Sequence, residues 1–157
     1  MKILKWFIYS FICIYLFVFI DSNITNFFHY GEPRAKLSSV KANAHTFQTV
    51  LETYAVDYGG HYDEFQIVKL EAEKKGYWKD FKNPFDYKAK AIIDLQNSIT
   101  INELTGRVEL QNFNAGTVLY DSVIENNFVA KYYLYGVSKE DNKLIVDKGQ
   151  VFYLSNN

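Results

Sequence analysis

The chain has 157 residues, a mass of 18.3 kDa and a formal net charge of −1, from 17 basic and 18 acidic side chains. This length allows one domain with a terminal appendage. The even balance of charge excludes a broad basic surface for nucleic acid. The single cysteine, Cys13, excludes a disulfide within these residues and a cysteine-based zinc site. The frequent aromatic residues, 13 Tyr and 13 Phe, favour β-sheet faces over a cofactor site.

The amino-terminal stretch is strongly apolar. Lys2 and Lys5 precede the run Trp6–Ile20, which only Ser10 interrupts. A run of this length is typical of a short membrane span or of the core of a secretory signal. Because it ends in bulky rather than small residues, we expect an uncleaved transmembrane signal anchor over residues 1–22, with a cleaved signal as the alternative. The flanking lysines predict a single-pass protein with the amino terminus inside and the carboxy-terminal domain outside.

Residues 23–33 are expected to form a juxtamembrane hinge, and residues 34–157 an extracytoplasmic domain. Gly31 and Pro33 interrupt any helix that rises from the membrane. Proline fits the first turn of a new helix but removes a hydrogen bond from a continuing one. A kinked continuous helix and a short hinge are both consistent with this pattern.

The stretch Pro33–Tyr62 predicts a long amphipathic helix. Its apolar residues alternate three and four apart, which keeps one side of a helix apolar for about six turns. Gly59 and Gly60 then predict the end of the helix, because glycine adopts the left-handed conformation without a steric clash. The apolar seam consists of Leu37, Val40, Ala44, Phe47, Leu51, Tyr54 and Tyr58.

A short second helix is expected to end at Lys75, closed by Gly76. Asp63 and Gln66 have the spacing of a capping box at its start. Its apolar face would consist of Phe65, Val68 and Ala72. An aromatic loop, Gly76–Phe85, follows, and Pro84 keeps it irregular.

The second half of the chain shifts toward a period of two from Ala91, which is typical of β-strands. Thr105-Gly106 and Glu140-Asp141-Asn142 supply turns between neighbouring strands and favour antiparallel pairing. The expected strands are Ile99–Leu104, Arg107–Leu110, Gly116–Tyr120, Ala130–Val137, Lys143–Asp147 and Gln150–Leu154.

The histidines and the acidic residues of two turns are candidate metal ligands, but structural roles also explain them. His29, His45 and His61 are far apart in sequence and fit surface or helix-edge positions better than a metal site. Oxygen ligands around the turn after the long helix, or at the Asp141-Asn142 turn, could hold calcium. Helix capping explains Asp63 more simply. The residues around the first of these turns are Asp57, His61, Asp63 and Glu64.

No sequence motif for catalysis is present. The chain has no G-x-S-x-G turn, P-loop or H-E-x-x-H helix, and no cysteine outside the apolar run. We therefore predict a protein that is not an enzyme, with no catalytic residues, no cofactor, no metal ligands and no small-molecule substrate.

The stretch Val40–Tyr62 also carries a family resemblance. It resembles the first helix of the soluble domain in type IV pilin-like proteins, most closely that of type II secretion pseudopilins. The family pattern has a Lys-x-Asn start, a Thr-x-Gln-Thr centre and a Tyr-Ala-x-Asp-x-Gly-Gly-x-Tyr end, which here are Lys41–Asn43, Thr46–Thr49 and Tyr54–Tyr62. The family usually continues with Pro, where this chain has Asp63. Looser similarity extends to Asn83–Phe85, Tyr133–Gly136 and Phe152–Asn156.

The resemblance implies an α+β, pilin-like fold, in which a long helix packs on an antiparallel β-sheet behind an amino-terminal transmembrane helix. It also implies a subunit or accessory protein of a type II secretion-like or type IV pilus-like envelope assembly. It would be located in the inner (cytoplasmic) membrane with its carboxy-terminal domain extracytoplasmic, and its partners would be the membrane and other pilin-like or secretion-machine subunits. The alternative is a membrane-anchored extracytoplasmic binding domain that reuses the fold, and a deep pocket beside Trp78 would favour it.

The amino terminus departs from the family pattern. Lys5, rather than Gly, precedes the apolar run, and no acidic residue lies within Trp6–Ile20. Pilin-like subunits usually have both a Gly at this junction and a Glu shortly after it. We therefore expect the chain to keep Met1 and to remain tethered to the membrane.

Overall fold

A computed structural model describes Tyr15 and residues 32–95, 101–102, 107–108, 113–125 and 128–156. The chain divides into two compact units, Met1–Ala35 and Lys36–Asn157. Apart from Tyr15, the expected membrane anchor lies outside the described residues, as do Gly31 and most of the expected hinge. Within the part that the structure describes, no helix combines the length and the apolar character that a membrane crossing needs.

Residues 32–57 are helical, with Pro33 as the second described residue of this helix, and the prediction of a long helix is confirmed. The predicted seam is buried from Val40 to Tyr54, where Phe47 and Leu51 have no exposed surface. Tyr58 follows the last helical residue, is 36% exposed and stacks on Tyr54 with ring centroids 4.3 Å apart. The seam is therefore a packing surface that ends one turn earlier than the sequence pattern indicates.

The helix ends as expected at the double glycine. Gly59 and Gly60 have φ angles of 72° and 89°, which residues with a Cβ rarely adopt. The Gly60 N–H donates to the carbonyl of Ala55 at 2.6 Å and closes the last turn. The chain can then reverse toward the second helix.

The second helix, α2, spans Phe65–Lys75, and Gly76 follows it in the left-handed conformation, as predicted. The predicted capping box is wrong. The capping position is Glu64, which makes no side-chain capping bond in the described part of the chain, and the Asp63 carboxylate instead accepts a hydrogen bond from the Tyr54 hydroxyl. Asp63 therefore bonds to a tyrosine of the preceding helix and not to the backbone at the start of α2. The predicted apolar face, Phe65, Val68 and Ala72, is buried.

The main sheet is mixed rather than wholly antiparallel, with the strand order β1-β4-β5-β8. The strand β1 runs parallel to β4, while the β4–β5 and β5–β8 pairs are antiparallel. Two further antiparallel pairs, β2–β3 and β6–β7, form small sheets. The strands are β1 (Ile92–Asp94), β2 (Ile101–Asn102), β3 (Arg107–Val108), β4 (Val118–Glu125), β5 (Phe128–Gly136), β6 (Val146–Asp147), β7 (Gln150–Val151) and β8 (Tyr153–Ser155).

The predicted strands differ from these in several ways, and the predicted strand Lys143–Asp147 is reduced to β6 (Val146–Asp147). The strand β1 was not predicted, because three residues without a local turn give little pattern. The strand predicted at Gly116–Tyr120 begins two residues later in the structure, at Val118, and continues to Glu125. The predicted strand Gln150–Leu154 is divided between two sheets, because Phe152 lies between β7 and β8 and its N–H donates to the carbonyl of Ile145. The fold class is nevertheless α+β, with a long helix on a sheet.

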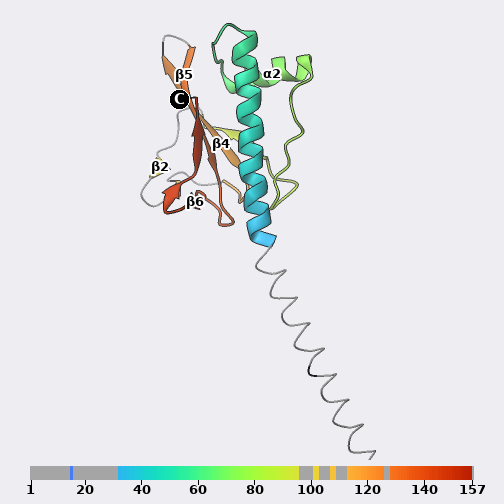
Figure 1. Cartoon of the computed structure of the whole chain (residues 1–157), viewed down its shortest axis with the longest axis vertical. Helices are drawn as coiled ribbons and strands as arrows, with labels where there is room; N and C mark the ends of the chain where they lie inside the picture. Colours follow the sequence, from blue (N-terminus) through green and yellow to red (C-terminus); the bar gives the residue numbers. More distant parts are fainter. Residues whose placement is uncertain are drawn as a thin grey trace, which may run out of the picture. The chain divides into compact units, whose positions relative to one another are not determined.

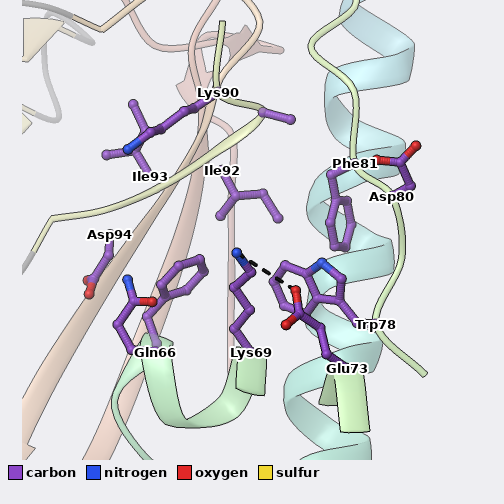
Figure 2. Close-up of a pocket in the computed structure, with 12 residues that line it drawn as sticks. Gln66, Lys69, Glu73, Trp78, Asp80, Phe81, Lys90, Ile92, Ile93 and Asp94 are labelled. Carbon is purple, nitrogen blue, oxygen red and sulfur yellow. Dashed lines mark ion pairs between the residues drawn. The ribbon is translucent and has the colours of Figure 1, made fainter. Parts of the chain in front are cut away.

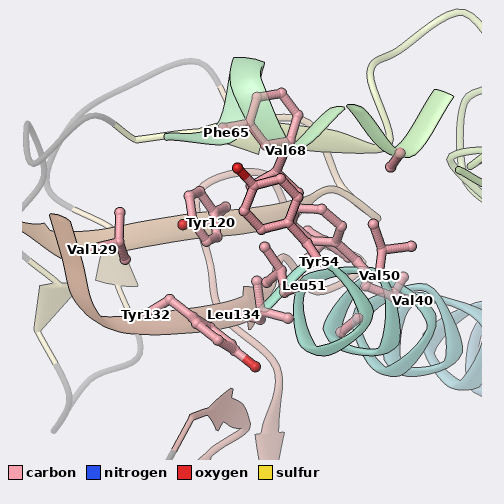
Figure 3. Packing of buried hydrophobic residues seen from close by; sticks show 14 of the residues in the cluster. Val40, Val50, Leu51, Tyr54, Phe65, Val68, Tyr120, Val129, Tyr132 and Leu134 are labelled. Atoms are coloured by element: carbon pink, nitrogen blue, oxygen red, sulfur yellow. The ribbon is translucent and has the colours of Figure 1, made fainter. Parts of the chain in front are cut away.

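The long helix and α2 lie side by side and share one hydrophobic core with the sheet (Figures 1 and 3). The ring of Phe47 is at its centre, with edge-on contacts to Phe65 and Tyr120, both at 5.7 Å between centroids. The same ring meets Trp78 and Phe81, both at 5.9 Å. Edge-on contacts of this kind are favourable because ring edges are positive and ring faces negative. The long helix, α2, the aromatic loop and β4 are therefore joined through one side chain.

Polar side chains at the borders of the seam fix the position of the long helix. The Asn43 Nδ2 donates to the carbonyl of Lys82 in the aromatic loop at 2.9 Å. The Gln48 Nε2 donates to the carbonyl of Ser155 in β8 at 3.1 Å. These two bonds connect the helix to the loop on one border and to the edge of the sheet on the other.

Glu52 forms a third connection, with two tyrosines. Its carboxylate accepts hydrogen bonds from the Tyr62 hydroxyl at 2.8 Å and the Tyr132 hydroxyl at 2.5 Å. Burial, together with this hydrogen bond, raises the pKa of Tyr62 to about 12. The same two causes, with burial again the larger, raise the pKa of Tyr132. The carboxylate therefore connects the helix to the turn that follows it and to β5.

Candidate binding cleft beside Trp78

A cleft of about 950 Å³ lies beside Trp78 (Figure 2). Three segments that are separate in sequence form its walls: α2, the aromatic loop and the segment that contains β1. Its volume is near the upper end of the range for ligand pockets. Its lining residues are Phe65, Gln66, Lys69, Glu73, Trp78, Asp80, Phe81, Lys90, Ala91, Ile92, Ile93 and Asp94.

The first wall is one face of α2. Residues three, four and seven apart lie on the same side of a helix, so Gln66, Lys69 and Glu73 all face the cleft. The Lys69 Nζ lies 3.8 Å from a Glu73 carboxylate oxygen and 5.8 Å from the centre of the Trp78 ring. Figure 2 shows Lys69 extending from α2 into the space between Gln66 and Trp78. This lysine thus brings a cation to an aromatic surface.

The second wall is aromatic, and the end of α2 places it. After Gly76 the chain folds back, and the N–H groups of Tyr77 and Trp78 both donate to the carbonyl of Ala72, at 3.0 and 3.1 Å. The Trp78 ring therefore lies against α2, with its centroid 5.3 Å from that of Phe81. Both rings are partly buried and rest on the core. A rigid aromatic surface results, which is favourable for binding because little side-chain entropy remains to be lost.

The third wall is the segment 90–94, which parallel pairing with β4 brings to the cleft. The Val118 N–H donates to the Ala91 carbonyl and the Leu95 N–H donates to the Tyr120 carbonyl, both at 2.8 Å. The hydroxyl of Thr117 also donates to the Lys90 carbonyl at 3.1 Å. The segment is therefore held along the start of β4.

The buried side chain of Asn83 fixes the aromatic loop to the same region. Its Oδ1 accepts from the N–H of Phe85 at 2.9 Å, and its Nδ2 donates to the carbonyl of Ala115 at 2.9 Å. Gly116 permits this close approach, since a Cβ at this position would lie 2.7 Å from Phe85 Cδ2 and closer still to Asn83 Oδ1. The loop and the start of β4 are therefore packed as one piece behind the cleft.

The charges of the cleft are mixed. Lys69 and Lys90 are its cations, while Glu73, Asp80 and Asp94 are its carboxylates. Asp94 also influences the neighbouring strand, because burial and then the Asp94 carboxylate raise the pKa of Asp121. A ligand would therefore meet aromatic rings together with charges of both signs, two of which, on Lys69 and Glu73, already form an ion pair.

Three of the residues considered for calcium around the first turn have other partners, and the fourth, Glu64, is exposed. Asp57 forms an ion pair with Lys75 at 3.0 Å, and Asp63 accepts from Tyr54. His61 is exposed and packs against the ring of Phe128, with centroids 5.2 Å apart. Among the residues that the structure describes, no group of three or more His, Cys, Asp or Glu side chains is placed to hold a metal ion.

The other residues considered as metal ligands also have structural contacts, in the part of the chain that the structure describes. The Asp141 carboxylate accepts from the Ala115 N–H at 2.7 Å, and the Asn142 Oδ1 accepts from the Phe113 N–H at 2.9 Å. His45 is exposed and lies edge-on to Phe152, whereas His29 is outside the described residues. The turn at Asp141-Asn142 is therefore attached to the start of β4.

The sequence had pointed to the Trp78 loop as the place where a pocket would favour a binding function, and the cleft lies there. Its third wall was missed, because only the parallel β1–β4 pairing brings the segment 90–94 to α2. No protein-family model, curated protein or solved structure matches the chain. The pilin-like resemblance thus stays a prediction that depends on the sequence of residues Val40–Tyr62.

Proposed function

We propose that the chain is a pilin-like or pseudopilin-like, membrane-anchored subunit or accessory protein of a type II secretion-like or type IV pilus-like envelope assembly. It acts by packing against other subunits and catalyses no reaction. The apolar segment Trp6–Ile20 holds it in the membrane, and the domain that begins near residue 34 carries its contacts with partners.

The observation that supports this proposal is the packing and hydrogen bonding of the stretch that resembles pilin-like proteins, Val40–Tyr62. Its apolar positions, among them Phe47 and Leu51, form the buried seam. Its polar positions fix the helix, through Asn43 to the aromatic loop and through Gln48 to β8. The pattern therefore has a structural reason at each of these positions: it specifies a long helix held on a sheet. This arrangement is what the resemblance implies for a pilin-like domain.

The test is a pull-down of the full chain, with a carboxy-terminal tag, from detergent-solubilised native membranes. The proposal expects co-purification of other proteins that have a single amino-terminal apolar segment followed by a long amphipathic helix. A tagged, unrelated single-pass membrane protein is the control. Recovery of the chain alone, under conditions that preserve known membrane complexes, would contradict the proposal.

The cleft favours a second function, that of a membrane-anchored extracytoplasmic binding domain. Its aromatic wall is preformed, Lys69 brings a cation to this wall, and Lys90 lines the same cleft. Binding pockets combine apolar walls with polar groups that fix the ligand, and this cleft has both, with half of its lining residues polar or charged.

Native mass spectrometry of the full chain purified from native membranes tests this second function. We expect a bound molecule that is lost in Trp78→Ala and retained in Leu70→Ala. Leu70 is on the same helix as Lys69, is 63% exposed and does not line the cleft, which makes it a matched control. Equal retention in both variants would place any bound molecule elsewhere.

A further inference from the structure

The third wall of the cleft consists of consecutive residues. All of the residues from Lys90 to Asp94 line it, although neighbouring side chains of a strand point to opposite faces. Ile92 packs against the core on the side of the long helix, whereas Ile93 packs on the opposite side of the sheet. A strand whose two faces both border one cleft must present its backbone edge to it. The cleft therefore extends along the edge of β1.

The pairing of β1 determines which backbone groups face that edge. Among the described residues β1 is the terminal strand of its sheet and pairs with β4. Ala91 and Leu95 use their backbone groups toward β4, and in a parallel ladder this direction alternates along the strand. The N–H and C=O of Ile92 accordingly face away from β4. They form a donor and acceptor pair at the middle of the cleft wall.

Charge and shape specify what would fit there. Lys90 lies two residues before Ile92, and Asp94 two residues after it. An extended chain that pairs with Ile92 would therefore meet a cation near one end and an anion near the other. Its middle side chain would lie on the side of Trp78 and Phe81, where an apolar group is suited.

We propose that the cleft takes an extended peptide segment of another protein, which adds to the outer edge of β1 and places an apolar side chain against Trp78 and Phe81. Such a segment has an acidic residue near Lys90 and a basic residue near Asp94. Strand addition gives affinity through backbone hydrogen bonds and selectivity through side-chain pockets. The inference rests on the second function proposed above, because it specifies the class of ligand that the cleft binds.

The test uses the full chain in detergent and two synthetic peptides with a fluorescent label, acetyl-Glu-Thr-Phe-Thr-Lys-amide and acetyl-Lys-Thr-Phe-Thr-Glu-amide. These place the acidic residue near Lys90 in a parallel and an antiparallel strand, respectively. We expect one of them to bind with a strong preference over the other, as measured by fluorescence anisotropy. Trp78→Ala should weaken that binding by about tenfold or more, and Leu70→Ala should leave it unchanged.

Because Trp78 also contacts the core, Lys90→Glu provides a second variant at an exposed position. It should weaken binding of the preferred peptide by about threefold or more, because it places a like charge opposite the peptide's glutamate. Replacing the glutamate of the peptide with lysine should restore binding to the Lys90→Glu variant. The same replacement should weaken binding to the unmodified protein. An unchanged affinity in Lys90→Glu would overturn the proposed charge pairing.

N-methylation of the peptide, one amide at a time, separates strand addition from other modes of binding. Loss of binding at alternate positions is expected, because only alternate amides of an added strand face β1. Binding that tolerates every methyl group but is lost in Trp78→Ala would overturn strand addition while leaving the cleft as a binding site. If neither peptide binds and the full chain forms a dimer that Lys90→Glu disrupts, the occupant is a second copy of this chain and the proposal fails.

Discussion

Replacement of Phe47 by alanine would test the packing on which the domain depends. The Phe47 side chain has no exposed surface. Its ring meets those of Phe65, Trp78, Phe81 and Tyr120 at centroid distances of 5.7–5.9 Å. Removal of this ring would leave a cavity between the long helix, α2, the aromatic loop and β4.

The expected loss follows from the size of the side chain and its full burial. Phe→Ala substitutions in a core cost about 3–5 kcal/mol, from lost transfer free energy and from the cavity. A natural domain has a free energy of unfolding of about 5–15 kcal/mol, so this is a large fraction of the total. With a denaturant dependence of about 2 kcal/mol per molar urea, the unfolding midpoint should fall by about 1.5–2.5 M.

The assay is urea unfolding of the full chain in detergent, followed by near-ultraviolet circular dichroism, which reports the packing of the aromatic rings. Val56→Ala is the matched control, because Val56 is on the same helix and 82% exposed. It should change the free energy of unfolding by less than about 0.5 kcal/mol. If Phe47→Ala also changes the free energy of unfolding by less than about 0.5 kcal/mol, the helix does not pack on the aromatic cluster and the reasoning is refuted.

Three further predictions concern the polar connections and one close contact. Glu52→Ala removes the acceptor of the Tyr62 and Tyr132 hydroxyls and should cost about 1–3 kcal/mol in urea unfolding, whereas Glu73→Ala, which breaks only an exposed ion pair, should cost less than about 0.5 kcal/mol. Equal losses in these two variants would contradict the role of Glu52. The pKa of Tyr62 is raised from 10.0 to about 12, so the folded state holds this proton more tightly than the unfolded state. Its contribution to stability should therefore be complete below pH 10 and decline as the pH rises from 10 through 12, which parallel titrations of tyrosinate absorbance and circular dichroism would detect. Because the chain has 13 tyrosines, Tyr62→Phe isolates the signal of Tyr62, and a difference in tyrosinate absorbance between the two folded proteins that titrates near pH 10 would contradict this. Gly116→Ala should cost about 1–3 kcal/mol more than Gly149→Ala, because both glycines have a φ of 83° but only Gly116 has neighbours within 4 Å of an added Cβ. Thermal unfolding of the two variants provides the comparison, and equal midpoints would show that the contact with Asn83 is not restrictive.

The features that could be predicted from the sequence are those with a local cause. The seam that includes Phe47 and Leu51 repeats with the period of a helix, and burial then follows because an apolar stripe must be covered. Gly59 and Gly60 mark the end of the helix through their backbone freedom alone. Both signals lie within a few residues of the structure that they specify.

The features that were missed depend on distant partners. Asp63 had the local spacing of a cap, but the Tyr54 hydroxyl, placed nearby by the helix, is its actual partner. The strand β1 is three residues long and pairs in parallel with β4, and no turn in the sequence indicates a parallel connection. The aromatic half of the cleft could be located from the Trp78 loop, whereas its β1 wall could not, for this same reason.

Cross-linking in intact native cells tests the central claim most directly. Full-length protein would be cross-linked before lysis, purified under denaturing conditions through a carboxy-terminal tag, and its covalent adducts identified by mass spectrometry. The account predicts adducts with envelope proteins that have one amino-terminal apolar segment and a pilin-like helix. An unrelated single-pass membrane protein of similar abundance should not form them. If the control forms its own known adducts while this chain forms none with such proteins, the proposed role in an envelope assembly is contradicted.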